Sequence, residues 1–318
     1  MPERLVVMLA FAGVNAIDVA GPLQAFISAD KLRAPAAPAY RLITASDGGG
    51  SVETAPGLCI ATEDLRALEG RVIDTLIVPG GLSEGTAGLE GLIGWLKGNG
   101  SSVRRLCSVC TGAFILGAAD LLKGRRVTTH WSGSAILAAR YPDVSVEPDC
   151  LYINDGHVWT SGGVTAGIDL ALALIEDDLG PSAALATARQ LVVFRRRPGG
   201  QSQFSAPTLP RPGAFATLNA WMADNLKRDL RVERLADRAG MSPRNFARVY
   251  LEETGSTPAR AVEALRLASA CRVLETTDLP LKTIADRAGL GSEQNLRRVI
   301  HRQFGIGPTD YRERFGRR

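Results

Sequence analysis

The sequence predicts an α/β domain with a flavodoxin-like, mostly parallel sheet sandwiched by helices, followed by an all-α domain with two helix-turn-helix units. Two observations support this division. Short apolar runs alternate with helical patterns through the first two-thirds of the chain. In the last third, a sequence pattern of about 50 residues occurs twice. A stretch rich in Pro, Gly and Ser separates the two regions. We therefore expect domains at 1–196 and 214–318, joined by a linker at 197–213.

The first domain has the alternating pattern of strands and helices. The predicted strands are the apolar runs Leu5–Leu9, Tyr40–Thr44, Thr75–Val78, Arg105–Val109 and Val158–Thr160. Helical spacing is clearest over Ala16–Ser28 and Thr165–Leu179. This order is typical of an open parallel sheet, in which ligands bind outside the carboxyl ends of the strands.

One cysteine stands at such a strand end. Cys110 follows the strand Arg105–Val109 and precedes the small residues Thr111–Ala113, which permit a tight turn into a helix. A thiol at a helix N-terminus is expected to favour the thiolate, and the backbone N–H groups of Thr111 and Gly81 can serve a developing oxyanion. His130 is a candidate base. The alternative is that Cys110 is a small apolar core residue and His130 a packed or surface residue.

Four motifs of this domain resemble the ThiJ/PfpI branch of the class I glutamine amidotransferase-like superfamily. They are Val78–Gly81, Ser108–Ala113, Thr128–Trp131 and Thr160–Asp169. The resemblance implies that Cys110 lies on a nucleophile elbow and is paired with Asp18 from the first helix. Isonitrile hydratases are similar in this stretch, which implies catalytic roles for Asp18, Cys110 and Thr111 if the domain is an enzyme. Ser132 stands where the amidotransferase triad has an acidic residue, so glutaminase activity is not expected.

The same elbow can bind a small molecule without turning it over, because a helix N-terminus and free amides form a receptor for a carboxylate or carbonyl group. We expect the effector pocket to consist of six residues from the motifs above. They are Asp18, Gly80, Gly81, Cys110, Thr111 and His130.

The repeat in the second domain predicts two helices suited to a DNA groove. Leu235–Gly240 recurs as Ile284–Gly289, and Ser242 and Ser292 are the expected N-caps of the helices that follow. The residues expected to face the core are Phe246, Val249 and Tyr250, and then Leu296, Val299 and Ile300. The residues left to contact DNA are Arg244, Asn245 and Arg248 in the first helix and Gln294, Asn295, Arg297 and Arg298 in the second. An apolar-faced helix over Pro258–Thr277 is expected to fix the two units relative to each other.

Charge and composition agree with a DNA-binding second domain. Residues 1–194 carry a net charge of −6 and residues 215–318 a net charge of +6, so the last third is the expected contact for a polyanion. No cofactor is expected, because three histidines and no second cysteine pair argue against a metal site, and Gly80–Gly85 lacks a nucleotide-binding fingerprint. Five cysteines without a framework and no long apolar run predict a cytoplasmic protein without a membrane span.

The second domain resembles the AraC/XylS family. The resemblance is carried by Ala285–Arg298, the stretch Phe304–Pro308 and the pair Tyr311-Arg312. It implies a metabolite-responsive transcriptional regulator of the amidotransferase-like subgroup, commonly an activator of a catabolic operon, and no enzyme. The expected partners are double-stranded DNA, RNA polymerase, a second copy in a homodimer, and an effector related to amino acids or quaternary amines. The alternative is a bifunctional or enzymatic protein with hydratase or hydrolase activity at Cys110.

Overall fold

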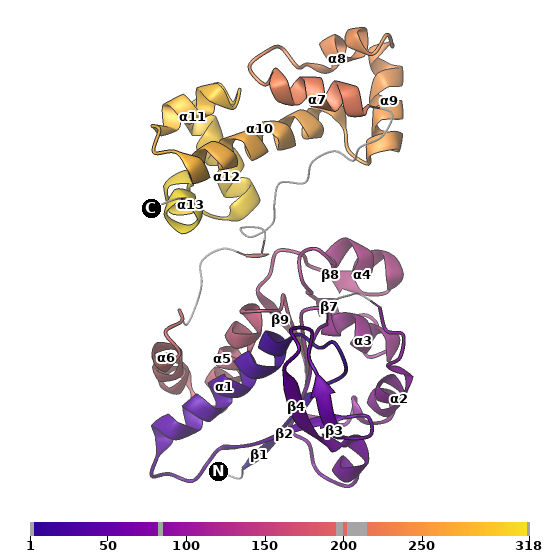
Figure 1. Cartoon of the computed structure of the whole chain (residues 1–318), viewed down its shortest axis with the longest axis vertical. Coiled ribbons are helices and arrows are strands. Elements are labelled where there is room, and N and C mark those ends of the chain that lie inside the picture. The colour runs from indigo at the N-terminus through magenta and orange to yellow at the C-terminus, as the bar shows by residue number, and fades with distance from the viewer. Residues whose placement is uncertain (1–2, 82–84, 195–199, 202–214, 317–318) are drawn as a thin grey trace. The chain divides into compact units, whose positions relative to one another are not determined.

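The chain folds into two compact units, Met1–Gln201 and Ser202–Arg318. The computed structural model describes residues 3–81, 85–194, 200–201 and 215–316, shown in colour in Figure 1. Of the expected linker 197–213, only residues 200 and 201 fall within this part.

The first unit is built on an eight-stranded sheet in the order β3-β4-β2-β1-β5-β6-β10-β9. The strands are β1 (Arg4–Leu9), β2 (Tyr40–Ser46), β3 (Gly50–Glu53), β4 (Cys59–Asp64), β5 (Thr75–Val78), β6 (Arg105–Val109), β9 (Tyr152–Asp155) and β10 (Val158–Ser161). The six strands from β4 to β10 in this order are parallel, and β3 and β9 pair antiparallel at the edges. The mostly parallel sheet is therefore confirmed. All five predicted strands are central ones.

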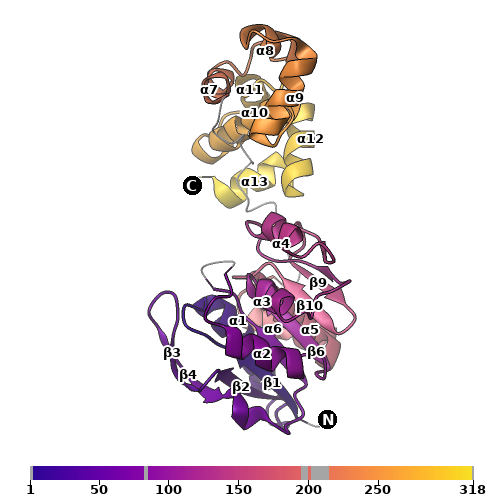
Figure 2. The same cartoon turned by 90° about the vertical axis from the view of Figure 1, so that its right-hand side faces the viewer.

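Helices cover both faces of this sheet (Figures 1 and 2). On one side lie α1 (Ala16–Arg33), α5 (Ala166–Leu179) and α6 (Pro181–Gln190). On the other lie α2 (Glu90–Asn99), α3 (Gly112–Ala118) and α4 (Ser134–Arg140). A short 3-10 helix, η1 (Leu65–Leu68), follows β4, and β7 (Arg126–Val127) pairs with β8 (Ser145–Val146) in a separate small ribbon. The edge strands β3 and β9, the neighbouring strand β4 and this ribbon were not predicted, because their sequences are short and only partly apolar.

A buried ion pair ties α5 to the amino ends of the strands. Arg105 at the start of β6 has a side chain only 3% exposed, and its Nη2 lies 2.5 Å from Asp178 Oδ2. Asp178, whose side chain is 1% exposed, also accepts hydrogen bonds from the hydroxyl of Tyr40 at 3.1 Å and from Arg104 at 2.7 Å. Two charges removed from water are tolerated only when each is paired and hydrogen-bonded in this way.

The second unit is all-helical. Its helices are α7 (Ala216–Asp224), α8 (Val232–Arg238), α9 (Pro243–Thr254), α10 (Pro258–Thr276), α11 (Leu281–Arg287), α12 (Glu293–Phe304) and α13 (Pro308–Phe315). They enclose two cores, one around Phe246 and the other around Phe304. Leu265 of α10 belongs to the first core and Leu274 to the second, so α10 joins the two helix-turn-helix units as expected.

The two units begin and end their second helices in the same way. Ser242 caps α9 by accepting a hydrogen bond from the amide of Asn245, and Ser292 caps α12 through the amide of Asn295. Both helices end at a glycine in the left-handed region. Five of the six residues predicted to face the core are fully buried, whereas Val249 is only half-buried.

Loss of the buried carboxylate should destabilise the first unit. Replacing Asp178 by Asn removes the nearest counter-charge of the buried Arg105 guanidinium and leaves only the longer contacts to Asp177 and Asp74, so we expect the free energy of unfolding to fall by roughly 3–5 kcal/mol. Asp177→Asn is the matched control, because that side chain is 52% exposed and exposed pairs contribute about 0–1 kcal/mol. Urea unfolding followed by circular dichroism measures both, and equal effects of the two substitutions would contradict the role given to Asp178.

Candidate ligand pocket and nucleic-acid interface

Cys110 occupies a tight turn between β6 and α3. Its backbone has φ = 57°, in the left-handed region that a non-glycine residue seldom adopts. Glycines make room for this turn. A Cβ atom at Gly163 would lie 2.1 Å from Cys110 Cβ, and one at Gly112 would lie 2.1 Å from the carbonyl oxygen of Val78. The nucleophile-elbow geometry that the resemblance implied is therefore present.

Asp18 lies behind the elbow and is fully buried. It comes from the first turn of α1, which is capped by Asn15. Its Oδ1 accepts a hydrogen bond from the amide of Val164 at 2.7 Å, and its Oδ2 accepts one from the amide of Gly80 at 3.2 Å. Burial raises the pKa of Asp18 to about 6, even though both amides and the thiol of Cys110 favour the charged form.

The surroundings of Cys110 disfavour its thiolate, contrary to the expectation from its position at a helix N-terminus. Burial raises its pKa to about 12, and the negative charge of Asp18 acts in the same direction. Cys110 is 6% exposed, so little water reaches the sulfur. The hydrogen bonds from Thr111 that favour the thiolate are outweighed. The sequence pattern could not reveal this balance, because it depends on how closely Gly80 and Gly163 close over the side chain.

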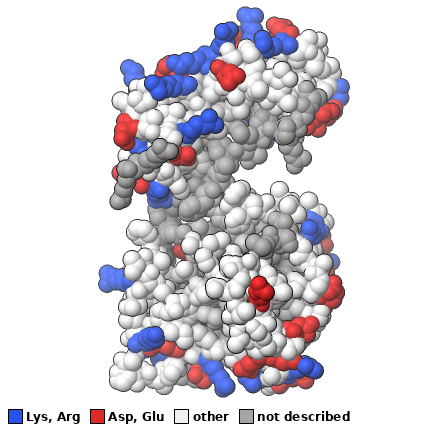
Figure 3. All heavy atoms as spheres, viewed as in Figure 1, with Lys and Arg blue, Asp and Glu red and all other residues white. Residues whose placement is uncertain are grey.

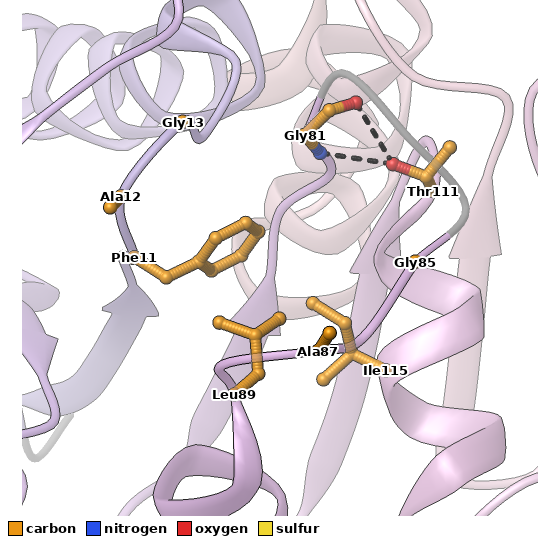
Figure 4. A pocket seen from close by; sticks show the side chains of 9 residues that line it. All are labelled: Phe11, Ala12, Gly13, Gly81, Gly85, Ala87, Leu89, Thr111 and Ile115. Atoms are coloured by element: carbon orange, nitrogen blue, oxygen red, sulfur yellow. Dashed lines mark hydrogen bonds between the residues drawn. The ribbon is translucent and has the colours of Figure 1, made fainter.

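Of the two amides expected to stabilise an oxyanion, those of Thr111 and Gly81, the amide of Gly81 already has a partner. The amide of Gly81 donates to Thr111 Oγ1 at 2.9 Å, and the same hydroxyl lies 3.2 Å from the carbonyl oxygen of Gly81 (Figure 4). The amide of Gly80 is occupied by Asp18. Neither N–H group is available to a substrate unless the present contacts break.

His130 lies on a neighbouring loop. Its Nδ1 is 2.7 Å from Ser132 Oγ, and its ring packs against Trp131 with centroids 5.3 Å apart. The loop touches the elbow through Thr129, whose hydroxyl donates to the carbonyl oxygen of Cys110 at 2.7 Å. Ser132 thus contacts the imidazole from the position where the amidotransferase triad has an acidic residue.

A cavity of about 170 Å³ opens beside the elbow (Figure 4). Its lining combines a polar end, formed by Gly81 and Thr111, with the apolar side chains of Phe11, Leu89 and Ile115. A larger groove of about 630 Å³ shares Phe11 and Leu89 with it. Of the six predicted pocket residues, Gly81 and Thr111 line this cavity among the described residues.

The other four predicted pocket residues have different places. Asp18 and Cys110 are buried behind the cavity, Gly80 connects them to it, and His130 lies on the adjacent loop. The apolar wall was missed, because Phe11, Leu89 and Ile115 come from three separated segments without a motif. Within the described residues, no cluster of side chains could hold a metal ion and no helix could span a membrane.

In the second unit, most of the predicted DNA-contacting side chains lie on the exposed faces of α9 and α12, and Asn295 is half-buried. The same pair recurs in both helices, with Arg248 donating to Asn245 Oδ1 at 3.1 Å and Arg298 donating to Asn295 Oδ1 at 2.8 Å. The amide nitrogen of Asn295 also donates to the carbonyl oxygen of Leu290, which holds this side chain against the turn.

Two of the predicted arginines already have carboxylate partners. Arg248 pairs with Glu252 at 2.8 Å, and Arg297 pairs with Glu293 at 2.7 Å. Within the described ranges, neither Arg244 nor Arg298 makes a salt bridge. Figure 3 shows further Lys and Arg side chains along one edge of this unit. Of the four predicted arginines, Arg244 and Arg298 are therefore the two without a carboxylate partner among the described residues.

The comparisons with known proteins match both units. Residues 4–177 match the DJ-1/PfpI family and residues 235–314 a helix-turn-helix domain. The HTH-type transcriptional regulator CdhR of Pseudomonas aeruginosa is 30% identical over 86% of this chain and 82% of its own length. An isonitrile hydratase of Pseudomonas putida is 38% identical over 38% of this chain and 52% of its own length. The crystal structure of a ThiJ/PfpI family protein from Pseudomonas syringae has a TM-score of 0.54 and 26% identity, and the match covers 62% of this chain and 78% of that one.

Removing the charge behind the elbow should make Cys110 more reactive. In Asp18→Asn the negative charge that helps raise the pKa of the thiol is gone, so we expect the pH profile of Cys110 alkylation to move to lower pH. A fall of one unit in pKa raises the rate about tenfold at neutral pH. Iodoacetamide labelling read by mass spectrometry at Cys110 measures this. Asp143→Asn removes an exposed charge elsewhere and should leave the profile unchanged.

Proposed function

The chain belongs to the DJ-1/PfpI family and continues into a helix-turn-helix domain of the AraC type, and from this we propose that a small molecule bound beside Thr111 controls its activity as a DNA-binding transcriptional regulator. The proposal assigns residues 1–196 to effector binding, 197–213 to a linker and 214–318 to DNA binding. DNA binding itself follows from the family of regulators to which the chain is similar along most of its length.

The observation that carries the effector proposal is the composition of the cavity beside the elbow. At about 170 Å³ it suits a small metabolite, with apolar contacts to Phe11 and Ile115 and with the remaining lone pairs of the Gly81 carbonyl and the Thr111 hydroxyl as hydrogen-bond acceptors. We take the effector to be related to amino acids or quaternary amines and the protein to be a homodimeric activator that works with RNA polymerase. These points rest on the resemblance to regulators of this architecture.

Several features of the elbow argue against physiological catalysis. The thiol of Cys110 has its pKa raised to about 12, and the amides of Gly80 and Gly81 already have partners. A nucleophilic mechanism needs a thiolate and free oxyanion donors. We therefore propose that the first unit binds its ligand without converting it.

An isonitrile hydratase-like activity is the second candidate, because Asp18, Cys110 and Thr111 are brought together at the elbow. The test is incubation of the full chain with an alkyl isonitrile and detection of the N-alkyl formamide that addition of water would give. We expect no turnover above that of Cys110→Ser. Turnover that disappears in that variant would favour the enzymatic alternative.

The decisive experiment for the regulator is selection of genome-derived fragments by the purified full chain at near-physiological salt. We expect a shared sequence motif whose half-sites are spaced by helical turns of about 34 Å. Affinity should fall steeply with salt, because the basic unit displaces counterions from the phosphates. Recovery of fragments without a common motif would contradict sequence-specific regulation.

Arg244 and Arg298 should determine which sequence is bound. Alanine at either position should reduce discrimination between the recovered motif and a single-base variant by about 1–3 kcal/mol, if each guanidinium contacts a guanine. Fluorescence anisotropy with both duplexes measures it. Arg189→Ala, an exposed arginine on α6 of the first unit, controls for loss of charge. Equal weakening on both duplexes would identify phosphate contacts instead.

Thr111→Val should weaken the response to effector while leaving DNA binding intact. Valine keeps the shape of the side chain but removes the hydroxyl that bridges both polar groups of Gly81. We expect induction of a reporter carrying the recovered motif to need at least about tenfold more inducer, as for loss of one buried hydrogen bond. Thr86→Val, just outside the cavity lining, is the control. Normal induction in Thr111→Val would exclude this cavity as the effector site.

A further inference from the structure

Gln201 is a buried glutamine at the end of the first unit. It is 4% exposed, although glutamine is usually a surface residue. Its Nε2 donates to the carbonyl oxygens of Thr129 and Cys150, both at 2.8 Å, and to Thr128 Oγ1 at 3.1 Å. Its Oε1 accepts the amide hydrogen of Trp131 at 2.8 Å. Both ends of the carboxamide are therefore bound.

Two glycines make room for this segment. A Cβ atom at Gly162 would lie 2.2 Å from Gln201 Cδ, and one at Gly200 would lie 2.0 Å from the carbonyl oxygen of Asp149. The side chain and the backbone beside it thus fit closely into the surface of the first unit. No residue larger than glycine fits at position 162 or 200 unless its neighbours move. Such close packing is typical of a specific binding site.

The chemistry of the site selects a primary carboxamide. Two backbone carbonyl oxygens face the Nε2 atom, so a carboxylate in the same place would meet like partial charges and could donate no hydrogen bond. An ammonium group would leave the amide of Trp131 without an acceptor. A neutral carboxamide has two N–H hydrogens for the two carbonyl oxygens and an oxygen for the amide of Trp131, and Thr128 Oγ1 can share one of those hydrogens.

The site touches the elbow at two points. The carbonyl of Thr129 binds Gln201 while its hydroxyl binds the carbonyl oxygen of Cys110 at 2.7 Å. Gly162 packs against Gln201, and the next residue, Gly163, packs against Cys110. A displacement of the elbow would therefore move the groups that bind the carboxamide. It would act through the hydrogen bonds of Thr129 and through the peptide bond between Gly162 and Gly163.

We propose that Thr128, Thr129, Trp131 and Cys150 form a carboxamide-binding site, that Gln201 of the same chain is its ligand, and that ligand binding at the elbow weakens this attachment. While Gln201 is bound, the chain leaves the first unit at a fixed point. Its release changes how the DNA-binding unit is tethered. This regulatory part rests on the function proposed above, whereas the site itself does not.

Two substitutions test the site, one by changing its ligand Gln201 and the other by changing Gly162, against which Gln201 packs. Gln201→Glu keeps the shape of the side chain but places a carboxylate against two carbonyl oxygens. Gly162→Ala keeps glutamine at position 201 but puts a methyl group where its carboxamide lies. The flexible side chain of Gln201 must therefore move out of the site. The matched controls are Gln190→Glu, an exposed glutamine on α6, and Gly94→Ala, where a Cβ would meet nothing within 4 Å.

Hydrogen exchange at the amide of Trp131 tests the site directly, because this N–H donates to Gln201. We expect exchange to accelerate about fivefold or more in both variants and in neither control. Alkylation of Cys110 tests the link to the elbow and should also accelerate in both variants. Unchanged exchange would overturn the site, and unchanged alkylation would overturn the link.

Reporter transcription from a promoter with the recovered motif tests the regulatory part. We expect Gln201→Glu to change basal expression at least about threefold, because the tether sets the effective concentration of the DNA-binding unit, with Gln190→Glu unchanged. Altered exchange with unaltered transcription would overturn the regulatory part. A wild-type chain that binds no DNA motif would contradict the proposed function, while the exchange result would still decide on the site.

Discussion

The left-handed turn at Cys110 is the constraint on which the first unit depends. With φ = 57° the chain passes from β6 into α3 within one residue, and this brings Gly80 and Gly163 against the cysteine. Asp18, Thr111 and Thr129 each hydrogen-bond to a backbone group of the elbow or of the adjoining β5 loop. The strain at one residue is thus balanced by contacts from several segments, and the cavity and the Gln201 site are built on those same segments.

The central strands, the principal helices and the duplicated helical unit could be predicted from the sequence because each has a strong apolar period. The edge strands β3 and β9 could not, since short, partly exposed strands lack that signal. At the elbow, the motifs located Cys110 and Asp18, but the ionisation of the thiol was predicted in the wrong direction. The sequence shows that Cys110 lies at a helix N-terminus, which lowers the pKa of a thiol. It does not show the burial that raises this pKa by more, because burial depends on the packed structure.

The duplication in the second unit is closer in structure than in sequence. Ser242 and Ser292 cap equivalent helices, and the same Asn–Arg contact follows on each. The helices differ where Arg244 is replaced by Gln294, and in which arginine is paired with a glutamate. The two helix-turn-helix units, which both pack on α10, can therefore share one way of docking on DNA. Their different exposed side chains would then contact different bases.

The protonation state of Cys110 also has a meaning for oxidative chemistry. Peroxides attack the thiolate, and burial together with the charge of Asp18 raises the pKa of the Cys110 thiol, which disfavours that form at neutral pH. The sulfur is in addition 6% exposed. Although its elbow has the form of a reactive site, burial therefore disfavours oxidation of Cys110 itself. A regulator built on this elbow, as proposed above, would respond to its ligand rather than to the oxidation state of Cys110.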